Sequence, residues 1–102
     1  MKPLLTTVSA LALLATAGIA HAADPDLGRN LAATCATCHG TNGQAVQGAG
    51  MEALAGMDKA KALQKLSEFR SGAKPASIMH QIAQGFTDEQ LDLMAAFFAA
   101  QK

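Results

Sequence analysis

The residues with the clearest chemical potential are two cysteines and a histidine close together in the sequence, Cys35, Cys38 and His39. Their spacing is C-x-x-C-H, the attachment pattern of a c-type haem. Two thiols on one helical turn can each form a thioether with a haem vinyl group, and the adjacent imidazole can then bind the iron. The pattern therefore predicts one covalent haem c, held by Cys35 and Cys38, with His39 as an axial ligand of the iron.

Two other chemistries use a C-x-x-C pair. A thiol–disulfide oxidoreductase would place the pair near a βαβ pattern, but no stretch of this sequence alternates with the period of a strand. A zinc site would need further ligands, and beyond residue 22 the sequence holds no other Cys and only one other His, His80. Both interpretations are therefore weaker than the haem interpretation.

The first 22 residues have the pattern of an export signal. Lys2 precedes an apolar run from Leu4 to Ala20, and the sequence A-H-A at residues 20–22 is an A-x-A cleavage site. We therefore expect a signal peptide at residues 1–22, a mature domain at residues 23–102 and a periplasmic location, outside the cytoplasm, where c-type haem is attached. A membrane anchor is the alternative, but the run is slightly short for a span, so none is expected after cleavage.

Removal of residues 1–22 would leave 80 of the 102 residues, enough for one small domain with a thin core. Covalent haem would give such a domain an apolar body around which helices can pack. The mature part would carry seven basic and eight acidic residues, a balance that argues against nucleic acid as a partner. Five of the bases form a basic flank, consisting of Lys59, Lys61, Lys65, Arg70 and Lys74. This flank could steer an acidic redox partner, or it is an ordinary solvated helix face.

Apolar spacing predicts two helices in the first part of the mature chain. The first is expected to begin at Asp24-Pro25 and to run directly into Cys35–His39. A Gly-rich loop at residues 40–50 follows it. The second helix is expected at residues 59–71, between an N-cap at Asp58 and a stop at Gly72.

The second part of the mature chain predicts a short compact segment, a last helix and no sheet. A short apolar segment at residues 76–83 ends near Gly85. The last helix is expected from about Asp88 to Ala100, and Thr87 and Gln90 at its start have the spacing of a capping box.

The second axial position decides whether a haem protein transfers electrons or binds a further ligand. Met79 follows the break at Pro75, on a compact segment that can fold across the distal face of a haem. His80 is the main competitor, and neighbours on one segment cannot both face the iron. The remaining candidates are methionines whose default role is packing or lining of the pocket, namely Met51, Met57 and Met94. Position alone leaves the choice open.

Several other stretches of the mature chain are informative when they are taken together with the C-x-x-C-H motif. The tetrapeptide G-T-N-G follows His39, and L-A-G at residues 54–56 and F-R-S-G at residues 69–72 come later. The most specific is the run P-A-S-I-M-H-Q-I-A-Q-G-F-T-D-E-Q at residues 75–90. Together these stretches resemble the small class I c-type cytochromes of bacterial periplasms. The similarity is greatest to the cytochrome subunit of flavocytochrome c sulfide dehydrogenase and to related diheme periplasmic cytochromes.

The resemblance implies an all-α fold, a single small cytochrome c domain of three to five helices wrapped around one covalent haem. It implies His39 as the proximal ligand and Met79 as the distal ligand of the haem iron. It also implies a close approach of Gly28, on the first helix, to an aromatic residue of the last helix, at Phe97 or Phe98.

The function implied by the resemblance is one-electron transfer, in which the iron cycles between Fe(III) and Fe(II), rather than enzymatic catalysis. The chain would be a free carrier or the haem subunit of a sulfide-oxidising flavoprotein complex. Its partners would be redox proteins, an exported flavoprotein and a terminal electron acceptor. The alternative function is a haem-based ligand binder with an open iron site.

The sequence departs from this family in two respects. Family members usually carry a Pro near the L-A-G stretch, and its backbone carbonyl orients the proximal His. This chain has no Pro between Gly40 and Lys74, so a backbone carbonyl around residues 48–50 is the expected substitute. Trp and Tyr, which often contact the haem propionates, are also absent. Arg, Lys, Asn or backbone amides are expected to take that role.

Overall fold

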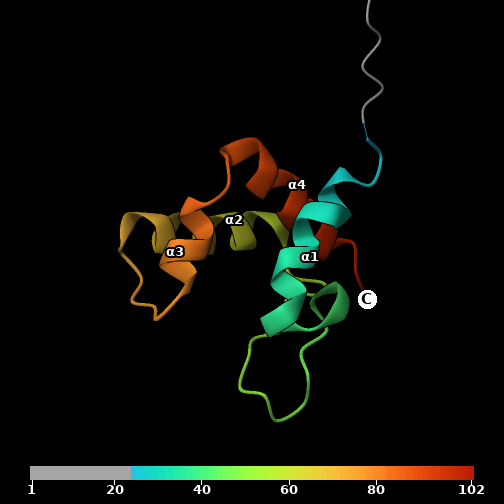
Figure 1. Cartoon of the computed structure of the whole chain (residues 1–102), viewed down its shortest axis with the longest axis horizontal. Coiled ribbons are helices and arrows are strands. Elements are labelled where there is room, and N and C mark those ends of the chain that lie inside the picture. Colours follow the sequence, from blue (N-terminus) through green and yellow to red (C-terminus); the bar gives the residue numbers. More distant parts are fainter. Residues whose placement is uncertain (1–23) are drawn as a thin grey trace, which may run out of the picture.

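The computed structural model describes residues 24–102, and the predicted signal peptide at residues 1–22 lies outside the described residues. The elements follow in the order α1 (Leu27–His39), the short 3₁₀ helix η1 (Thr41–Gly43), α2 (Lys59–Ser71), α3 (Met79–Gln84) and α4 (Asp88–Ala99) (Figure 1). Residues 24–102 contain no strand, so the predicted all-α fold is confirmed. Over this range none of the helices combines the length and apolar character needed to cross a membrane.

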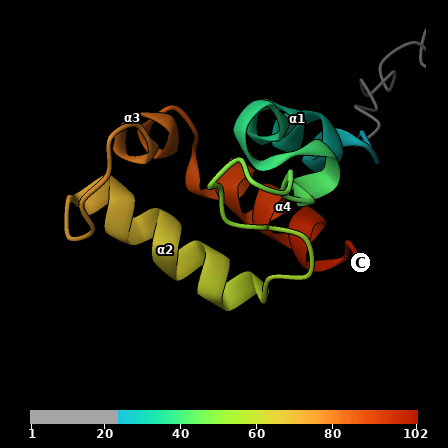
Figure 2. The ribbon, with the colours of Figure 1, turned by 90° about the horizontal axis from the view of Figure 1, so that it is seen from below.

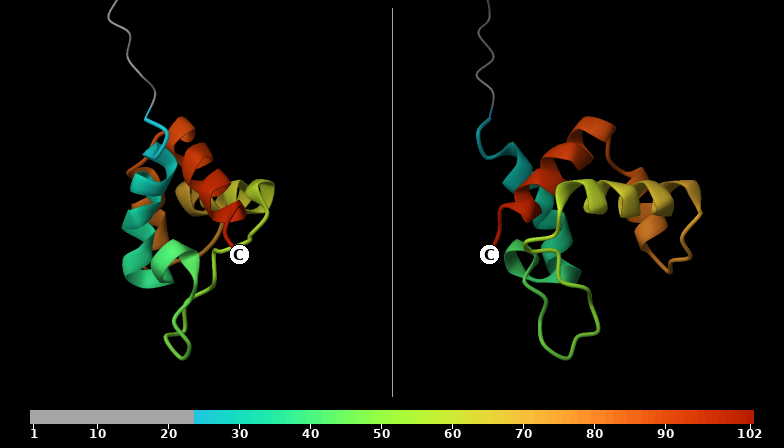
Figure 3. Two further views of the ribbon diagram at one scale, coloured as in Figure 1. Left: turned by 90° about the vertical axis from the view of Figure 1, so that its right-hand side faces the viewer. Right: turned by 180° about the vertical axis from the view of Figure 1, so that it is seen from behind.

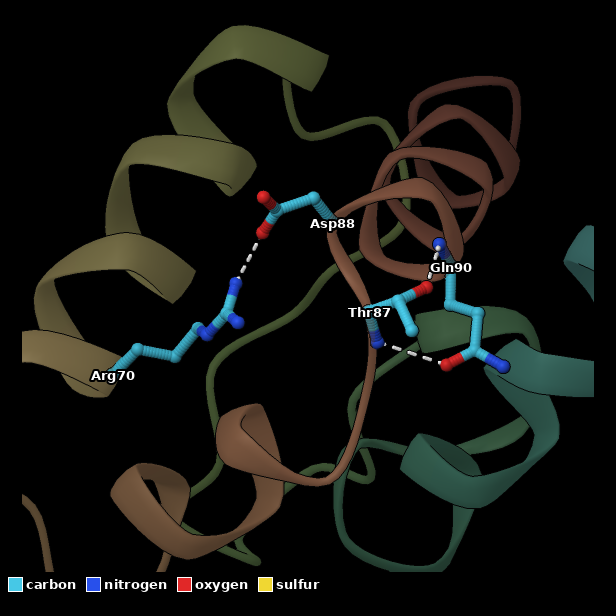
Figure 4. Close-up of polar contacts among 4 residues, drawn as sticks. All are labelled: Arg70, Thr87, Asp88 and Gln90. Atoms are coloured by element: carbon cyan, nitrogen blue, oxygen red, sulfur yellow. Dashed lines mark hydrogen bonds and ion pairs between the residues drawn. The ribbon is translucent and has the colours of Figure 1, made fainter.

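The ends of α2 and α4 are determined by local side-chain chemistry. The Asp58 carboxylate accepts a hydrogen bond from the backbone N–H of Lys61 at 3.1 Å, and Gly72 ends α2 in the left-handed conformation at φ 82°. At the start of α4, the Thr87 hydroxyl accepts from the N–H of Gln90, and the Gln90 side chain accepts from the N–H of Thr87 (Figure 4). Both predicted bounds of α2 and the predicted capping box are confirmed.

The first helix begins later than the sequence predicts. The Asp24 carboxylate accepts a hydrogen bond from the N–H of Asp26 at 2.9 Å. This local turn uses the side chain that was predicted to cap the helix, so α1 begins at Leu27. From there α1 continues into Cys35–His39 as predicted. The compact segment predicted at residues 76–83 forms helix α3 from Met79 onward.

Each helix packs against one or two others, and α4 lies between α1 and α2 in this series of contacts. Helix α1 packs against α4, and α2 packs against both α3 and α4. Figure 2 shows α1 and α3 on the same side of α2 and apart from each other, an arrangement that Figure 1 also shows. The buried core lies where α1 crosses α4 and consists of Ala32, Leu91, Met94 and Phe98.

The crossing of α1 and α4 is close at Gly28. A Cβ atom at this position would lie 3.0 Å from the backbone oxygen of Leu93, so the absent side chain lets the two backbones approach. The predicted approach of Gly28 to the last helix is confirmed. The nearest atoms belong to Leu93, however, and not to the predicted Phe97 or Phe98.

A long loop, residues 44–58, joins η1 to α2 and reaches out beyond the helices (Figure 3). Its second half is tied to the rest of the fold by backbone hydrogen bonds. The Gly43 carbonyl accepts from Leu54 and Ala55 at 2.8 and 3.0 Å, and the Phe98 carbonyl accepts from Gly56 at 2.8 Å. These bonds attach the loop to η1 and to the last turn of α4.

Candidate haem-binding site

All four residues of the predicted site line one cavity. It has a volume of about 200 Å³ and is bordered by all four helices and by the loop at residues 44–58. Cys35, Cys38 and His39 come from the last turns of α1, and Met79 comes from the first turn of α3. Helices α1 and α3 stand apart (Figure 2), so His39 and Met79 reach the cavity from different walls.

The two cysteines lie one helical turn apart on α1. Both are free thiols, with Cys35 half-buried and Cys38 exposed. Burial raises the pKa of the Cys35 thiol, and the neighbouring charge of Cys38 adds to the effect. Over residues 24–102 no group of three or more His, Cys, Asp or Glu side chains is arranged to hold a metal ion directly.

The imidazole of His39 is oriented by the loop. Its Nδ1 lies 2.7 Å from the backbone oxygen of Glu52. A carbonyl oxygen can only accept, so Nδ1 carries the proton and Nε2 keeps a free lone pair. This is the tautomer that an axial ligand needs, with the other ring nitrogen held by an acceptor. A backbone carbonyl therefore does substitute for the missing Pro, but it belongs to Glu52 rather than to residues 48–50.

Met79 and His80 face different surroundings. Met79 lines the cavity that also holds His39. His80 lines a second hollow, between the end of α2 and α3, together with Arg70, Lys74 and Gln84. Its Nδ1 is buried there and has no hydrogen-bond partner among the described residues. The arrangement favours Met79 over His80 as the residue available to a haem in the first cavity.

The other methionines that line the cavity are placed differently from Met79. Met94 is only 4% exposed and belongs to the core cluster, where it packs with Phe98. Met51 lines the cavity from the loop, next to Glu52, and is 46% exposed. Met57 also borders the cavity, from the turn that precedes α2.

The walls of the cavity fit an apolar, planar group. Most of the lining side chains are aliphatic or aromatic, including Leu54, Ala62, Leu66, Phe69, Ile78, Ile82, Ala95 and Phe98. The charged lining residues are Glu52 and Lys65, which form an ion pair at 2.6 Å. The hydrogen bond from Lys65 holds the pKa of the Glu52 carboxyl below its usual value. Two thiols, a free Nε2, a thioether and apolar walls form a donor set and surroundings that fit haem c.

Three members of the basic flank are paired within the protein. The pairs are Lys59 with Asp92, Lys65 with Glu52, and Arg70 with Asp88. The last pair links α2 to the start of α4 (Figure 4). Lys74 lies over the ring of Phe69, with its Nζ 5.4 Å from the ring centroid. Because three of the five charges are matched by acidic partners, the flank is better interpreted as a helix face paired within the fold than as a steering surface.

Glu52 and Lys65 are the two site residues that the sequence did not reveal. Thirteen positions separate them, and neither stands in a motif, so only the fold brings them together at His39. A hint was available in the absence of Pro, which required some other carbonyl beside the proximal His.

Comparison with known proteins places this geometry in context. The family described as Cytochrome c matches residues 25–102. The chain is 43% identical over 74 residues to the thiosulfate dehydrogenase electron acceptor of Stutzerimonas stutzeri (strain A1501), covering 72% of this chain and 34% of that protein. It is 33% identical over 96 residues to cytochrome c4 of Pseudomonas aeruginosa PAO1, covering 93% of this chain and 47% of the relative.

A third relative is the cytochrome subunit of sulfide dehydrogenase of Chlorobaculum tepidum, 30% identical over 71 residues, with 70% of this chain and 63% of that protein covered. The chain thus spans about one third to one half of the length of the two relatives above.

Proposed function

Because the chain belongs to the cytochrome c family of electron-transfer proteins, which carry haem c, we propose that it is a one-electron carrier with a single haem held between His39 and Met79. One observation supports this ligation most strongly. Met79 and the C-x-x-C-H residues line the same apolar cavity, whereas the competing His80 lines another hollow. The Nδ1 of His39 donates to Glu52, which leaves Nε2 available to an iron ion.

Each residue of the site has a separate task in this proposal. When bound, haem c supplies a one-electron Fe(III)/Fe(II) couple whose potential depends on the axial ligands, their hydrogen bonds and burial. Cys35 and Cys38 would hold the group through thioethers, and the Glu52 carbonyl orients His39. The apolar walls exclude water, and the Met79 thioether would take the sixth position. With both axial positions taken, the site suits a carrier and not an enzyme.

The spectrum of the holoprotein tests the ligation. Met79→Ala should lose the far-red charge-transfer band that marks Met–Fe(III) bonding, and its ferrous form should bind CO rapidly. Met57→Ala, which removes another thioether from the same cavity, should keep the band and resist CO. The ligation is wrong if Met79→Ala retains the band, and the haem assignment itself is wrong if purified wild-type protein gives no pyridine haemochrome of haem c.

The location and partners form a second part of the proposal. The signal-like residues 1–22 support export to the periplasm. Two relatives named for dehydrogenases of thiosulfate and of sulfide support electron acceptance from a dehydrogenase of reduced inorganic sulfur. An exported sulfide-oxidising flavoprotein is the donor we propose, with a terminal acceptor downstream. Stopped-flow reduction of the holoprotein by such a flavoprotein plus sulfide should be rapid, and absence of reduction would contradict this part alone.

A further inference from the structure

Glu52 makes one contact through its backbone carbonyl and another through its side-chain carboxylate. Its backbone carbonyl accepts the hydrogen bond from His39 Nδ1 at 2.7 Å, and its carboxylate pairs with Lys65 Nζ at 2.6 Å. Lys65 lies in the middle of α2, which is capped at both ends. One residue of an irregular loop thus connects the proximal histidine to a regular helix.

The loop has few other contacts in this stretch. In the described structure, residues 50–53 make no backbone–backbone hydrogen bond, and the loop is bonded again only from Leu54 onward. A Cβ at Gly48 or Gly50 would meet nothing within 4 Å, which shows that the loop lies in open space there. The position of the Glu52 carbonyl therefore depends strongly on where its side chain is held.

The ion pair is well placed to hold it. The Lys65 side chain is 23% exposed and contributes to the cavity wall, so salt screens this pair less than a pair between two fully exposed side chains. The Glu52 carboxylate is 54% exposed, so the pair adds little to the free energy of unfolding. We expect the pair to affect the geometry of the hydrogen bond at His39 and not the stability of the overall fold.

We propose that the Glu52–Lys65 pair is a positioning device, which holds the Glu52 carbonyl against His39 and thereby tunes the reduction potential of the haem iron. This inference rests on the proposed role of His39 as the proximal ligand. A histidine that donates its other N–H to a carbonyl is a more basic ligand. Greater basicity stabilises Fe(III), so a looser Nδ1–H···O bond should raise the potential.

A charge-neutral double variant tests the proposal. Lys65→Met combined with Glu52→Gln removes the pair without changing the net charge, so Coulomb effects on the iron largely cancel. We expect a higher reduction potential by spectroelectrochemistry and a several-fold faster exchange of the His39 Nδ1 proton with D₂O by NMR. The swapped variant, Lys65→Glu with Glu52→Lys, restores an ion pair and should return both properties toward the wild-type values.

The matched control uses another pair on the same helix. Lys59→Met with Asp92→Asn also removes a neutral ion pair from α2, one that joins it to α4 rather than to the loop. This control should leave the potential and the proton exchange unchanged. Because both pairs are at least partly exposed and every variant keeps the net charge, all variants are expected to fold with native haem content.

Three outcomes would overturn parts of the account separately. If the double variant keeps the wild-type potential and proton exchange, the positioning role is wrong. If the swapped variant shows the same changes as the double variant, the Lys65 ammonium itself, and not the pair, sets the potential. If the His39 ring protons show no hyperfine shift in the oxidised wild-type holoprotein, His39 does not bind the iron, and the proposed ligation is wrong instead.

Discussion

Substitution of Gly43 by alanine should destabilise the protein more than the same change at any open glycine of the loop. Gly43 ends η1 at φ 77°, and its carbonyl accepts hydrogen bonds from Leu54 and Ala55. A Cβ here would lie 2.7 Å from the Phe98 Cδ1 atom, 2.8 Å from the Ala55 backbone nitrogen and 2.9 Å from the Leu54 Cβ. The methyl group therefore meets backbone as well as side chains, and the loop or the Phe98 ring must move.

The magnitude follows from two separate effects. A left-handed conformation costs a non-glycine residue about 1–2 kcal/mol. Overpacking in a filled site adds about 1–3 kcal/mol. Gly48 is the matched control, because its φ is 82° but a Cβ there would meet nothing within 4 Å. Gly48→Ala should thus show only the first effect, and Gly43→Ala should be less stable than Gly48→Ala by about 1–3 kcal/mol.

Denaturant unfolding of the two holoproteins, followed by far-UV circular dichroism, measures this difference. The corresponding gap in Tm is about 4–8 °C for each kcal/mol in a domain of this size. Equal stability of Gly43→Ala and Gly48→Ala would refute the reasoning, since it would mean that the space beside Gly43 is not filled by Phe98 and the loop.

Three further predictions concern a helix cap, the thiols and pH. Thr87→Ala removes one half of the capping box and should lower the free energy of unfolding by about 1 kcal/mol, measured by urea denaturation; an unchanged midpoint would contradict the assigned cap. In apoprotein at mildly alkaline pH, iodoacetamide should alkylate Cys38 before Cys35, because Cys35 is more buried and its pKa is raised. Peptide mapping would show the order, and faster labelling of Cys35 would argue against the burial. Because Lys65 lowers the pKa of Glu52 from 4.5, this carboxylate stabilises the fold fully above that pH, and the contribution is lost as the pH falls through the lower native value. The effect should be below about 1 kcal/mol and absent from Glu52→Gln, and an identical acid profile for both proteins would disprove it.

The sequence predicted a helix bound well where the residues that determine it are neighbours in the sequence. Asp58 and Gly72 each act on backbone groups a few positions away, and both ends of α2 agree with the prediction. Thr87 and Gln90 likewise contact each other across one turn. The start of α1 was misplaced because Asp24 has two local options, a helix cap or a turn, and the structure uses it in the turn.

The contacts that the sequence could not reveal are long-range. Nothing in the order of residues indicates that Glu52 presents its carbonyl to His39, thirteen positions earlier, or that Lys65 holds its carboxylate. For the same reason the sequence left open whether the basic flank is a steering surface or a solvated helix face, since Asp88 and Asp92 reach it only when α4 packs on α2. The chemistry of the C-x-x-C-H motif was readable from its spacing, but the group that orients its histidine depends on the path of the loop.

The most direct test of the account is a proton NMR spectrum of the reduced holoprotein. A methionine bound to haem iron lies under the macrocycle, where the ring current moves its methyl signal far upfield. We predict one such signal, present in the wild-type protein and in Met57→Leu and absent from Met79→Leu. A signal that persists in Met79→Leu, or a wild-type spectrum with no upfield methyl group, would contradict the central claim that this chain holds its haem between His39 and Met79.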